Sequence, residues 1–177
     1  MRELHLRSHA LLSLAVLVFF GACASVPITK TGEIPRGSEI VVVGFRDCLI
    51  SGQDEDCNGS GVKAGEAFQE AFNEGGKFTS RLVDRPVGPK DALSNEAAAE
   101  FGRRNGHNYV LHGEVDDFYS VAAMTFRTDR AAATMRIVRA TDGQVMASYS
   151  KVGKASSNFA TPKGMIKDIA IFVRDGL

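Results

Sequence analysis

The chain has 177 residues, of which 21 are basic and 21 acidic, so its formal net charge at pH 7 is +0. This balance excludes the bulk positive charge with which many proteins attract nucleic acid, and we expect no nucleic-acid partner. Hydrophobic residues make up 44% of the sequence, as is usual for a protein with one buried core.

The first 22 residues have the organisation of a secretion signal. Arg2 and Arg7 precede an apolar run from Ala10 to Phe20, after which small residues follow. A transmembrane helix needs about 20 apolar residues, and this run is shorter. The chain is therefore predicted to be exported, with residues 1–22 as a lipoprotein signal peptide.

Two cleavage sites compete around Cys23. Residues 20–23, Phe-Gly-Ala-Cys, resemble a bacterial lipobox, with Phe20 where Leu is usual. That resemblance implies a diacylglyceryl thioether on Cys23 and an N-acyl chain such as palmitate. Residues 22–24, Ala-Cys-Ala, also suit ordinary signal peptidase, which would cut before Ser25 and leave no anchor. A cysteine at the end of the apolar run favours lipidation.

Lipidation at Cys23 would hold the protein permanently at a membrane, because two or more acyl chains bind stably where one does not. Ala24 replaces the Asp that tends to retain such proteins at the inner membrane. We therefore expect the periplasmic face of the outer membrane. The mature 155 residues suit one domain, with residues 23–38 as a tether and residues 39–177 as a single periplasmic α/β domain.

Strand and helix patterns alternate in the first half of the domain. Residues 39–45 are a Val-rich run typical of a strand buried on both faces, and residues 77–83 and 108–118 are two further strands. A helix between the first two has apolar residues at helical spacing, with Ser60 as its cap and Gly75-Gly76 at its end: Ala64, Ala67, Phe68, Ala71 and Phe72. Such β-α-β units favour parallel strands.

The second predicted helix has its stripe at Leu93, Ala97 and Phe101, with Asp91 or Ser94 as cap and Gly106 at its end. Residues 131–140 and 144–153 then form a hairpin around Asp142-Gly143.

A last helix begins at Thr161-Pro162. Its apolar side contains Ile166, Ile169, Ala170, Val173 and Leu177, together with Met165 and Phe172, whereas Ile171 points to the polar side. The predicted fold class is α/β (α+β): a mixed sheet of about five strands in the order β-α-β-α-β-β-β-α, with the helices packed on the sheet.

Residues 48–61, CLISGQDEDCNGSG, carry the main candidate chemistry. Asp54, Asp56 and Asn58 match the first ligand positions of a calcium loop, but Gly65 occupies the place of the final bidentate Glu. Gly59-Ser60-Gly61 before a helix could receive a phosphate, although the spacing is not that of a dinucleotide site. The acidic loop is a weak metal candidate.

Cys48 and Cys57 are predicted to form a structural disulfide. They lie nine residues apart rather than in the C-x-x-C spacing of redox sites, and an exported compartment is oxidising. Zinc is disfavoured because His107 and His112 are not at ligand spacing to either cysteine.

Three residues in or at the end of the third predicted strand are candidate catalytic groups. His112 is interpreted as a satisfied histidine of the sheet, and Asp116-Asp117 as a solvated strand end rather than an acid–base pair. We therefore expect no catalytic residues, no enzyme activity and no cofactor.

The segments NYVLHGEVDDF and MRIVRATDGQVMASYSKVGKA, residues 108–118 and 135–155, resemble a recurring pattern of a strand ending in Gly-Glu-Val followed by a hairpin. The pattern is found in small bacterial outer-membrane lipoproteins with a curli-secretion-channel (CsgG)-like or TolB-N-terminal-like α/β domain. An uncharacterised family of such lipoproteins also has GSG, here Gly59 to Gly61, before its first helix.

This resemblance implies a lipid-anchored interaction or assembly module, such as one in a secretion or surface-structure apparatus, with itself or other envelope proteins as partners. No strand pair is long enough for a membrane barrel of the curli-channel kind. The alternative function is a periplasmic ion- or small-ligand-binding lipoprotein that uses the loop of residues 48–61.

Overall fold

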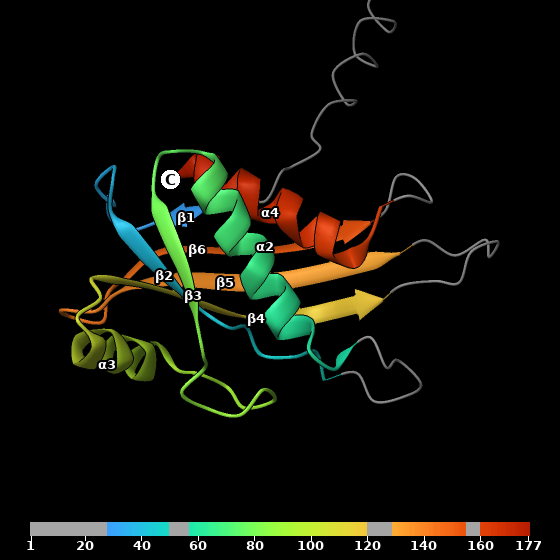
Figure 1. The fold of residues 1–177 in the computed structure, drawn as a ribbon, viewed down its shortest axis with the longest axis horizontal. Coiled ribbons are helices and arrows are strands. Elements are labelled where there is room, and N and C mark those ends of the chain that lie inside the picture. The colour runs from blue at the N-terminus through green and yellow to red at the C-terminus, as the bar shows by residue number, and fades with distance from the viewer. Residues whose placement is uncertain (1–27, 50–56, 120–128, 155–159) are drawn as a thin grey trace, which may run out of the picture.

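The computed structural model describes residues 28–49, 57–119, 129–154 and 160–177. Six strands and three helices follow one another along this part of the chain (Figure 1). They are β1 (Thr29–Lys30), β2 (Glu39–Val43), α2 (Ser60–Glu74), β3 (Thr79–Val83), α3 (Asn95–Asn105), β4 (Tyr109–Tyr119), β5 (Arg130–Arg139), β6 (Val145–Lys154) and α4 (Pro162–Gly176).

The strands form one mixed sheet in the order β1-β6-β5-β4-β2-β3. β2 pairs parallel with β3 and with β4, while β4, β5 and β6 form an antiparallel meander. The predicted fold class is confirmed, and from Glu39 onward the order of elements is the predicted one. All of β2 after Glu39 is buried, as expected for a strand with helices on both faces.

β1 is the element that the sequence analysis did not expect, because it lies inside the predicted tether. Thr29 pairs with Ser148 and Lys30 with Ala147 at the edge of β6. Ile34 is buried, and Ile28 packs against the main core. Residues 28–38 are therefore part of the fold, and the domain does not begin at Glu39.

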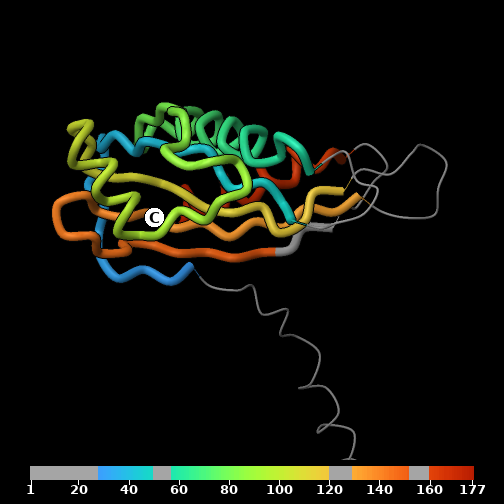
Figure 2. The backbone as a smooth tube through the Cα atoms, turned by 90° about the horizontal axis from the view of Figure 1, so that it is seen from below, coloured from blue at the N-terminus to red at the C-terminus, as the bar shows by residue number. Residues whose placement is uncertain are grey.

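Helices cover both faces of the sheet, in three layers. α2 and α4 lie side by side on one face (Figures 1 and 2), where the core includes Ile40, Val42 and Leu111. The neighbouring residues Val43 and Val110 point to the other face, into a smaller cluster beneath α3. This alternation along β2 and β4 is the period of two that a pleated strand imposes.

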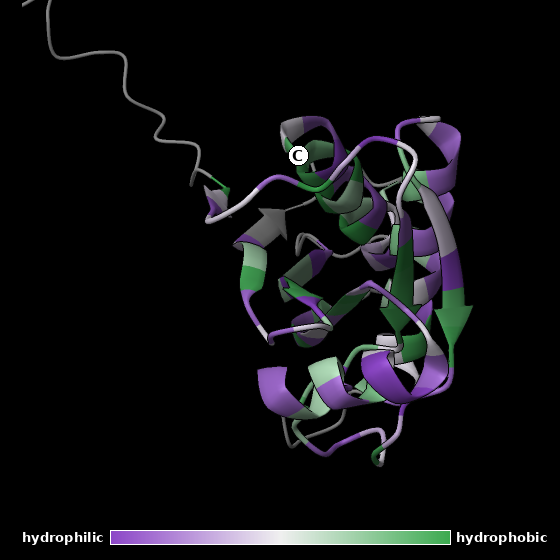
Figure 3. Cartoon of the chain, turned by 90° about the vertical axis from the view of Figure 1, so that its left-hand side faces the viewer, coloured by the Kyte–Doolittle hydropathy of each residue, from purple (hydrophilic) through white to green (hydrophobic). Residues whose placement is uncertain are grey.

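α2 and α4 are joined along their outer sides by a ladder of ion pairs. Lys163 contacts Glu66 at 2.9 Å and Glu70 at 3.2 Å, and Lys167 contacts Glu74 at 2.7 Å. These partly exposed pairs stabilise little and mainly keep the outward helix surfaces polar, as the hydropathy colouring in Figure 3 shows. No helix within the described ranges is long and apolar enough to cross a membrane.

α3 approaches the sheet through small residues, and the predicted stripe of this helix is wrong at Ala97. Ala97 is exposed, whereas Ala98, Ala99 and Gly102 are buried. A Cβ added to Gly102 would come within 2.7 Å of the Ala140 Cβ, so close approach of the helix requires glycine there. Ser94 caps the helix by accepting from the Ala97 amide, and Gly106 ends it at φ +72°.

The predicted orientation of two residues in α4 is also wrong. Ile171 is partly buried and packs against the main core, while Phe172 is 40% exposed. Phe172 stacks at 5.3 Å on Tyr149 of β6, which places it at the margin of the core rather than inside it. Thr161 caps the helix as predicted, with its hydroxyl accepting from the Gly164 amide.

Candidate functional site

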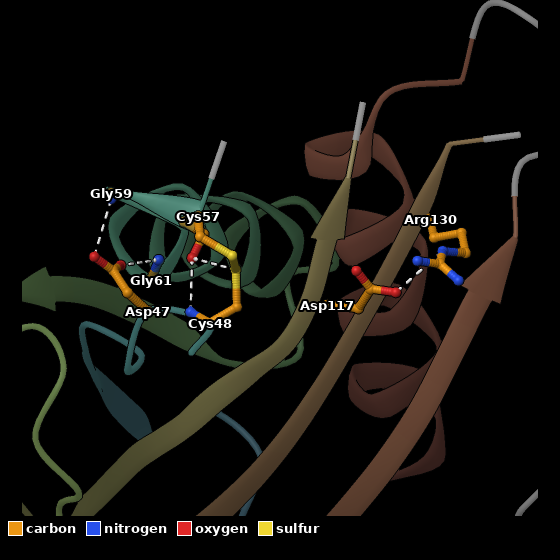
Figure 4. Close-up of a disulfide and its surroundings, with 8 residues drawn as sticks. Asp47, Cys48, Cys57, Gly59, Gly61, Asp117 and Arg130 are labelled. Atoms are coloured by element: carbon orange, nitrogen blue, oxygen red, sulfur yellow. Dashed lines mark hydrogen bonds and ion pairs between the residues drawn. A yellow bond between two sulfur atoms is a disulfide. The ribbon is translucent and has the colours of Figure 1, made fainter. Parts of the chain in front are cut away.

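The cysteine loop leaves β2 and returns to the start of α2. Cys48 and Cys57 are joined in a disulfide, with Cα atoms 5.2 Å apart. Both are buried, at 2% and 7% exposure, and both belong to the main core (Figure 4). The bridge therefore contributes to the packing beneath the start of α2 in addition to closing a loop.

Asp47 is a residue whose role sequence reasoning missed. It is 4% exposed, and its carboxylate accepts from the Gly59 amide at 3.0 Å and from the Gly61 amide at 2.7 Å (Figure 4). A carboxylate at a helix N-terminus is stabilised by these amides and by the positive end of the helix dipole. Ordinary capping signals lie within three residues of the helix, so a partner 12 and 14 positions away leaves no local trace.

Ser60 does not cap α2 as predicted. The N-cap is Gly59, at φ 76°, without a side-chain hydrogen bond. Ser60 is instead fully buried, where its hydroxyl accepts from the Cys48 amide at 3.2 Å and lies 3.7 Å from the Cys48 Sγ. It therefore ties the disulfide to the helix start.

This arrangement explains why Gly59-Ser60-Gly61 is not a phosphate cradle. The amides of Gly59 and Gly61 already bind an anion of the chain itself, the carboxylate of Asp47. A Cβ at Gly61 would also overlap the carbonyl of Phe45, so the glycine is required by close backbone packing. The helix start is a structural junction.

Only one of the three candidate calcium ligands lies within the described residues. Asp54 and Asp56 lie outside the described residues, and Asn58 is exposed just before α2. Within the described ranges, no group of three or more His, Cys, Asp or Glu side chains is arranged to hold a metal ion. A calcium site in this loop stays a prediction.

The opposite face of the sheet carries a second polar arrangement, which we call the polar strip. It lies on β4, β5, β6 and the segment after β2, beside the part of the sheet that α3 covers. Its members are Arg46, Glu114, Asp116, Asp117, Arg130, Thr134, Arg136 and Ser150.

The charges of the polar strip are arranged in pairs. Arg46 forms an ion pair with Glu114, and Asp117 lies 3.2 Å from Arg130. The backbone of Arg46 is also held in place: its amide donates a hydrogen bond to the Gly113 carbonyl, and its carbonyl accepts one from the Val115 amide, on either side of Glu114. Both pairs are therefore set on hydrogen-bonded backbone of the sheet.

Asp116 and Asp117 do not form an acid–base pair. Asp116 is the extra residue of a β-bulge, and its carboxylate accepts from the Thr134 hydroxyl at 2.9 Å, whereas Asp117 pairs with Arg130. Partial burial raises the pKa of Asp116, with repulsion from Glu114 adding to it and the Thr134 hydrogen bond opposing it. Each carboxylate has its own partner.

His112 is a buried residue of the sheet, as interpreted from the sequence. It is 2% exposed, and its Nε2 lies 3.1 Å from Asn95 Oδ1 at the start of α3. Burial, together with the positive charges of Arg136 and Arg85, lowers its pKa to about 4. The ring is therefore neutral at pH 7 and serves as a link between β4 and α3.

Two adjoining cavities open at the end of the domain that lies away from the start of α2, where β1 and the ends of α2 and α4 meet. One, of about 610 Å³, is lined mainly by the β1–β2 connection, and the other, of about 390 Å³, by the α2–β3 connection and the end of α4. Arg36 and Lys77 line both, and Lys30 and Arg174 line one each. Both cavities are open and rich in basic side chains.

Comparisons with known proteins identify the fold. No protein-family model matches the chain, and no curated protein sequence matches it. The PelC dodecamer from Paraburkholderia phytofirmans has a similar structure, with a TM-score of 0.62 and 16% identity over 85% of this chain and 96% of that chain. Lipoprotein GNA1162 from Neisseria meningitidis has a TM-score of 0.50 and 14% identity over 78% of this chain and 96% of that chain.

At these identities the likeness concerns the fold. The predicted resemblance to small bacterial lipoproteins is supported to that extent, because one of the structures is such a protein. The narrower resemblance to curli-channel and TolB domains stays a prediction.

Proposed function

We propose that the protein is a non-enzymatic lipoprotein of the bacterial envelope, anchored through Cys23 at the periplasmic face of the outer membrane, whose α/β domain is an assembly module. Its partners are further copies of the chain or other envelope proteins, in a secretion or surface-structure apparatus. The polar strip is the observation that carries this proposal.

The polar strip has the properties of a protein-binding surface. It is built on paired strands, it contains three arginines, and it presents charges of both signs at defined positions. Arginine is enriched in protein interfaces, and complementary charge sets register and partner choice more than raw affinity. The carboxylates of the strip are engaged by neighbouring side chains, an arrangement that suits recognition better than proton transfer.

The fold comparisons support the same function. The PelC structure is described as a dodecamer, and GNA1162 as a lipoprotein. A domain of this fold can therefore both form an assembly and belong to a lipoprotein. A ring of identical copies would need a heterologous interface, in which two different surfaces of each copy meet.

The experiment is a size measurement of the detergent-extracted mature protein by light scattering, with a charge reversal in the strip. We expect an oligomer in the wild type and a smaller species in Arg136→Glu, because like charges then face each other across the interface. Arg104→Glu on α3, whose side chain is 76% exposed, is the matched control and should leave the size unchanged. A strict monomer under all conditions, with no envelope protein crosslinked through the strip, would contradict the proposal.

A further inference from the structure

The start of the domain limits how the anchored protein can lie at the membrane. Only residues 24–28 separate Cys23 from β1, because Thr29 is already paired with β6. Five residues reach at most about 18 Å when fully extended. A domain of this length has a radius of gyration of about 15 Å, so its full width is more than twice that reach.

A lipid on Cys23 therefore keeps one particular end of the domain near the membrane. Ile28 lies against the end of α4, since a Cβ on Gly176 would overlap the side chain of Ile28. Figure 1 shows β1, the end of α4 and the α2–β3 connection together at this end, while the α2 start, the end of β4 and the start of β5 lie at the other.

The basic cavities described above are at this same end. We call Lys30, Arg36 and Lys77, the basic residues there that make no ion pair within the described chain, the basic cluster. Arg174 is different, because it pairs with Asp175 at 2.7 Å and donates to the Ala71 carbonyl. Its role is to satisfy the end of α2.

The cluster keeps a positive excess when its acidic neighbours are included. Glu33 lines the larger cavity, and Asp175 of the smaller cavity is already paired with Arg174. Lys30 and Arg36 are exposed. Charges act across about 8 Å at physiological ionic strength, so these side chains must come close to a surface to bind it.

We propose that the basic cluster rests on the anionic phospholipid surface to which Cys23 anchors the chain, and that the opposite end of the domain faces away from the membrane. This inference rests on the proposed function, because it requires the lipid on Cys23. The short tether brings the cluster within reach of the headgroups, and its charge fits their phosphates. The membrane would thereby orient the polar strip in the same way in every copy.

The test is hydrogen exchange, followed by mass spectrometry, of the full mature protein in vesicles of phosphatidylcholine alone or with phosphatidylglycerol. Each basic side chain near an anionic surface strengthens association by about fivefold. We expect slower exchange in residues 29–38 and 75–78 with phosphatidylglycerol, and loss of that protection in Lys30→Glu/Arg36→Glu. The control Lys90→Glu/Arg104→Glu reverses two exposed charges elsewhere and should keep it.

The outcomes separate the inference from the proposed function. Equal exchange of these segments in both vesicle types, or equal loss of protection in the two double variants, overturns the inference while the protein can still be a lipoprotein. The intact mass of the same sample tests the anchor. A mass that corresponds to an unmodified start at Ser25 overturns the proposed function and this inference with it.

Discussion

Acid should destabilise the protein through His112, and the structure sets the size of the effect. The ring is 2% exposed, and its pKa is lowered from 6.5 to about 4, first by burial and then by Arg136 and Arg85. The unfolded chain therefore binds a proton at a higher pH than the folded one. The contribution of neutral His112 to the free energy of unfolding is complete well above pH 6.5. It falls as the pH drops below 6.5 and stops falling near pH 4.

The full loss due to this residue is about 3 kcal/mol, from the difference between the two pKa values. Between pH 7 and pH 5 the loss is about 2 kcal/mol, a large share of the 5–15 kcal/mol that typical domains have. His112→Gln removes this titration and keeps an N–H that can donate to Asn95. The variant should lose stability over the same pH interval only through its other titrating groups.

Urea unfolding of wild type and His112→Gln at pH 7 and pH 5 measures this difference. We expect the wild type to lose about 2 kcal/mol more than the variant between the two pH values, whatever the variant costs at pH 7. Asn58→Gln, a substitution at an exposed position, is the control and should lose as much stability between pH 7 and pH 5 as the wild type. Equal pH dependence in wild type and His112→Gln would refute the reasoning.

Three further predictions concern the start of α2. Asp47→Asn should lower the free energy of unfolding by about 2 kcal/mol, because the Gly59 and Gly61 amides lose a charged acceptor. Urea unfolding measures this loss against the control Asp84→Asn, which changes an exposed carboxylate. Equal stability of the two variants would contradict the role of Asp47. Replacing both Cys48 and Cys57 by Ser should lower the free energy of unfolding by roughly 2–3 kcal/mol, the value of the chain-entropy model for a loop of this size. An unchanged urea midpoint would argue against the bridge. So would a wild-type mass that does not rise by about two daltons on reduction. Calcium titration by calorimetry tests the ion-binding form of the alternative function. A stoichiometric response that Asp56→Ala abolishes would support a calcium site in the loop, and no response would exclude it.

Much of the fold follows from local sequence patterns. The Val-rich run after Glu39, the Asp142-Gly143 turn and the Thr161-Pro162 cap are signals within a few residues, and each predicted element is present. β1 escaped prediction because two residues show no periodicity and gain their stability only from β6. Ala97 and Ile171 were misplaced because the helix faces that are buried depend on what packs against them.

The candidate sites divide in the same way. The pairing of Cys48 with Cys57 could be predicted from compartment and spacing, and the structure joins them. The role of Asp47 could not be predicted, because its hydrogen bonds reach 12 and 14 residues along the chain. The polar strip could not be predicted from any single segment either, since Arg46, Glu114 and Arg136 come from three parts of the sequence.

The sequence by itself determined the order of elements from Glu39 onward and the disulfide cysteines, because each depends on neighbours in the chain. Only the tertiary structure decided that residues 28–38 belong to the domain, which anion occupies the start of α2 and which charges share a face. Those features depend on strand order and on close packing between distant segments, which no local pattern records. The short distance from Cys23 to β1 is the clearest case, because a two-residue pairing with β6 turned most of a predicted tether into part of the domain.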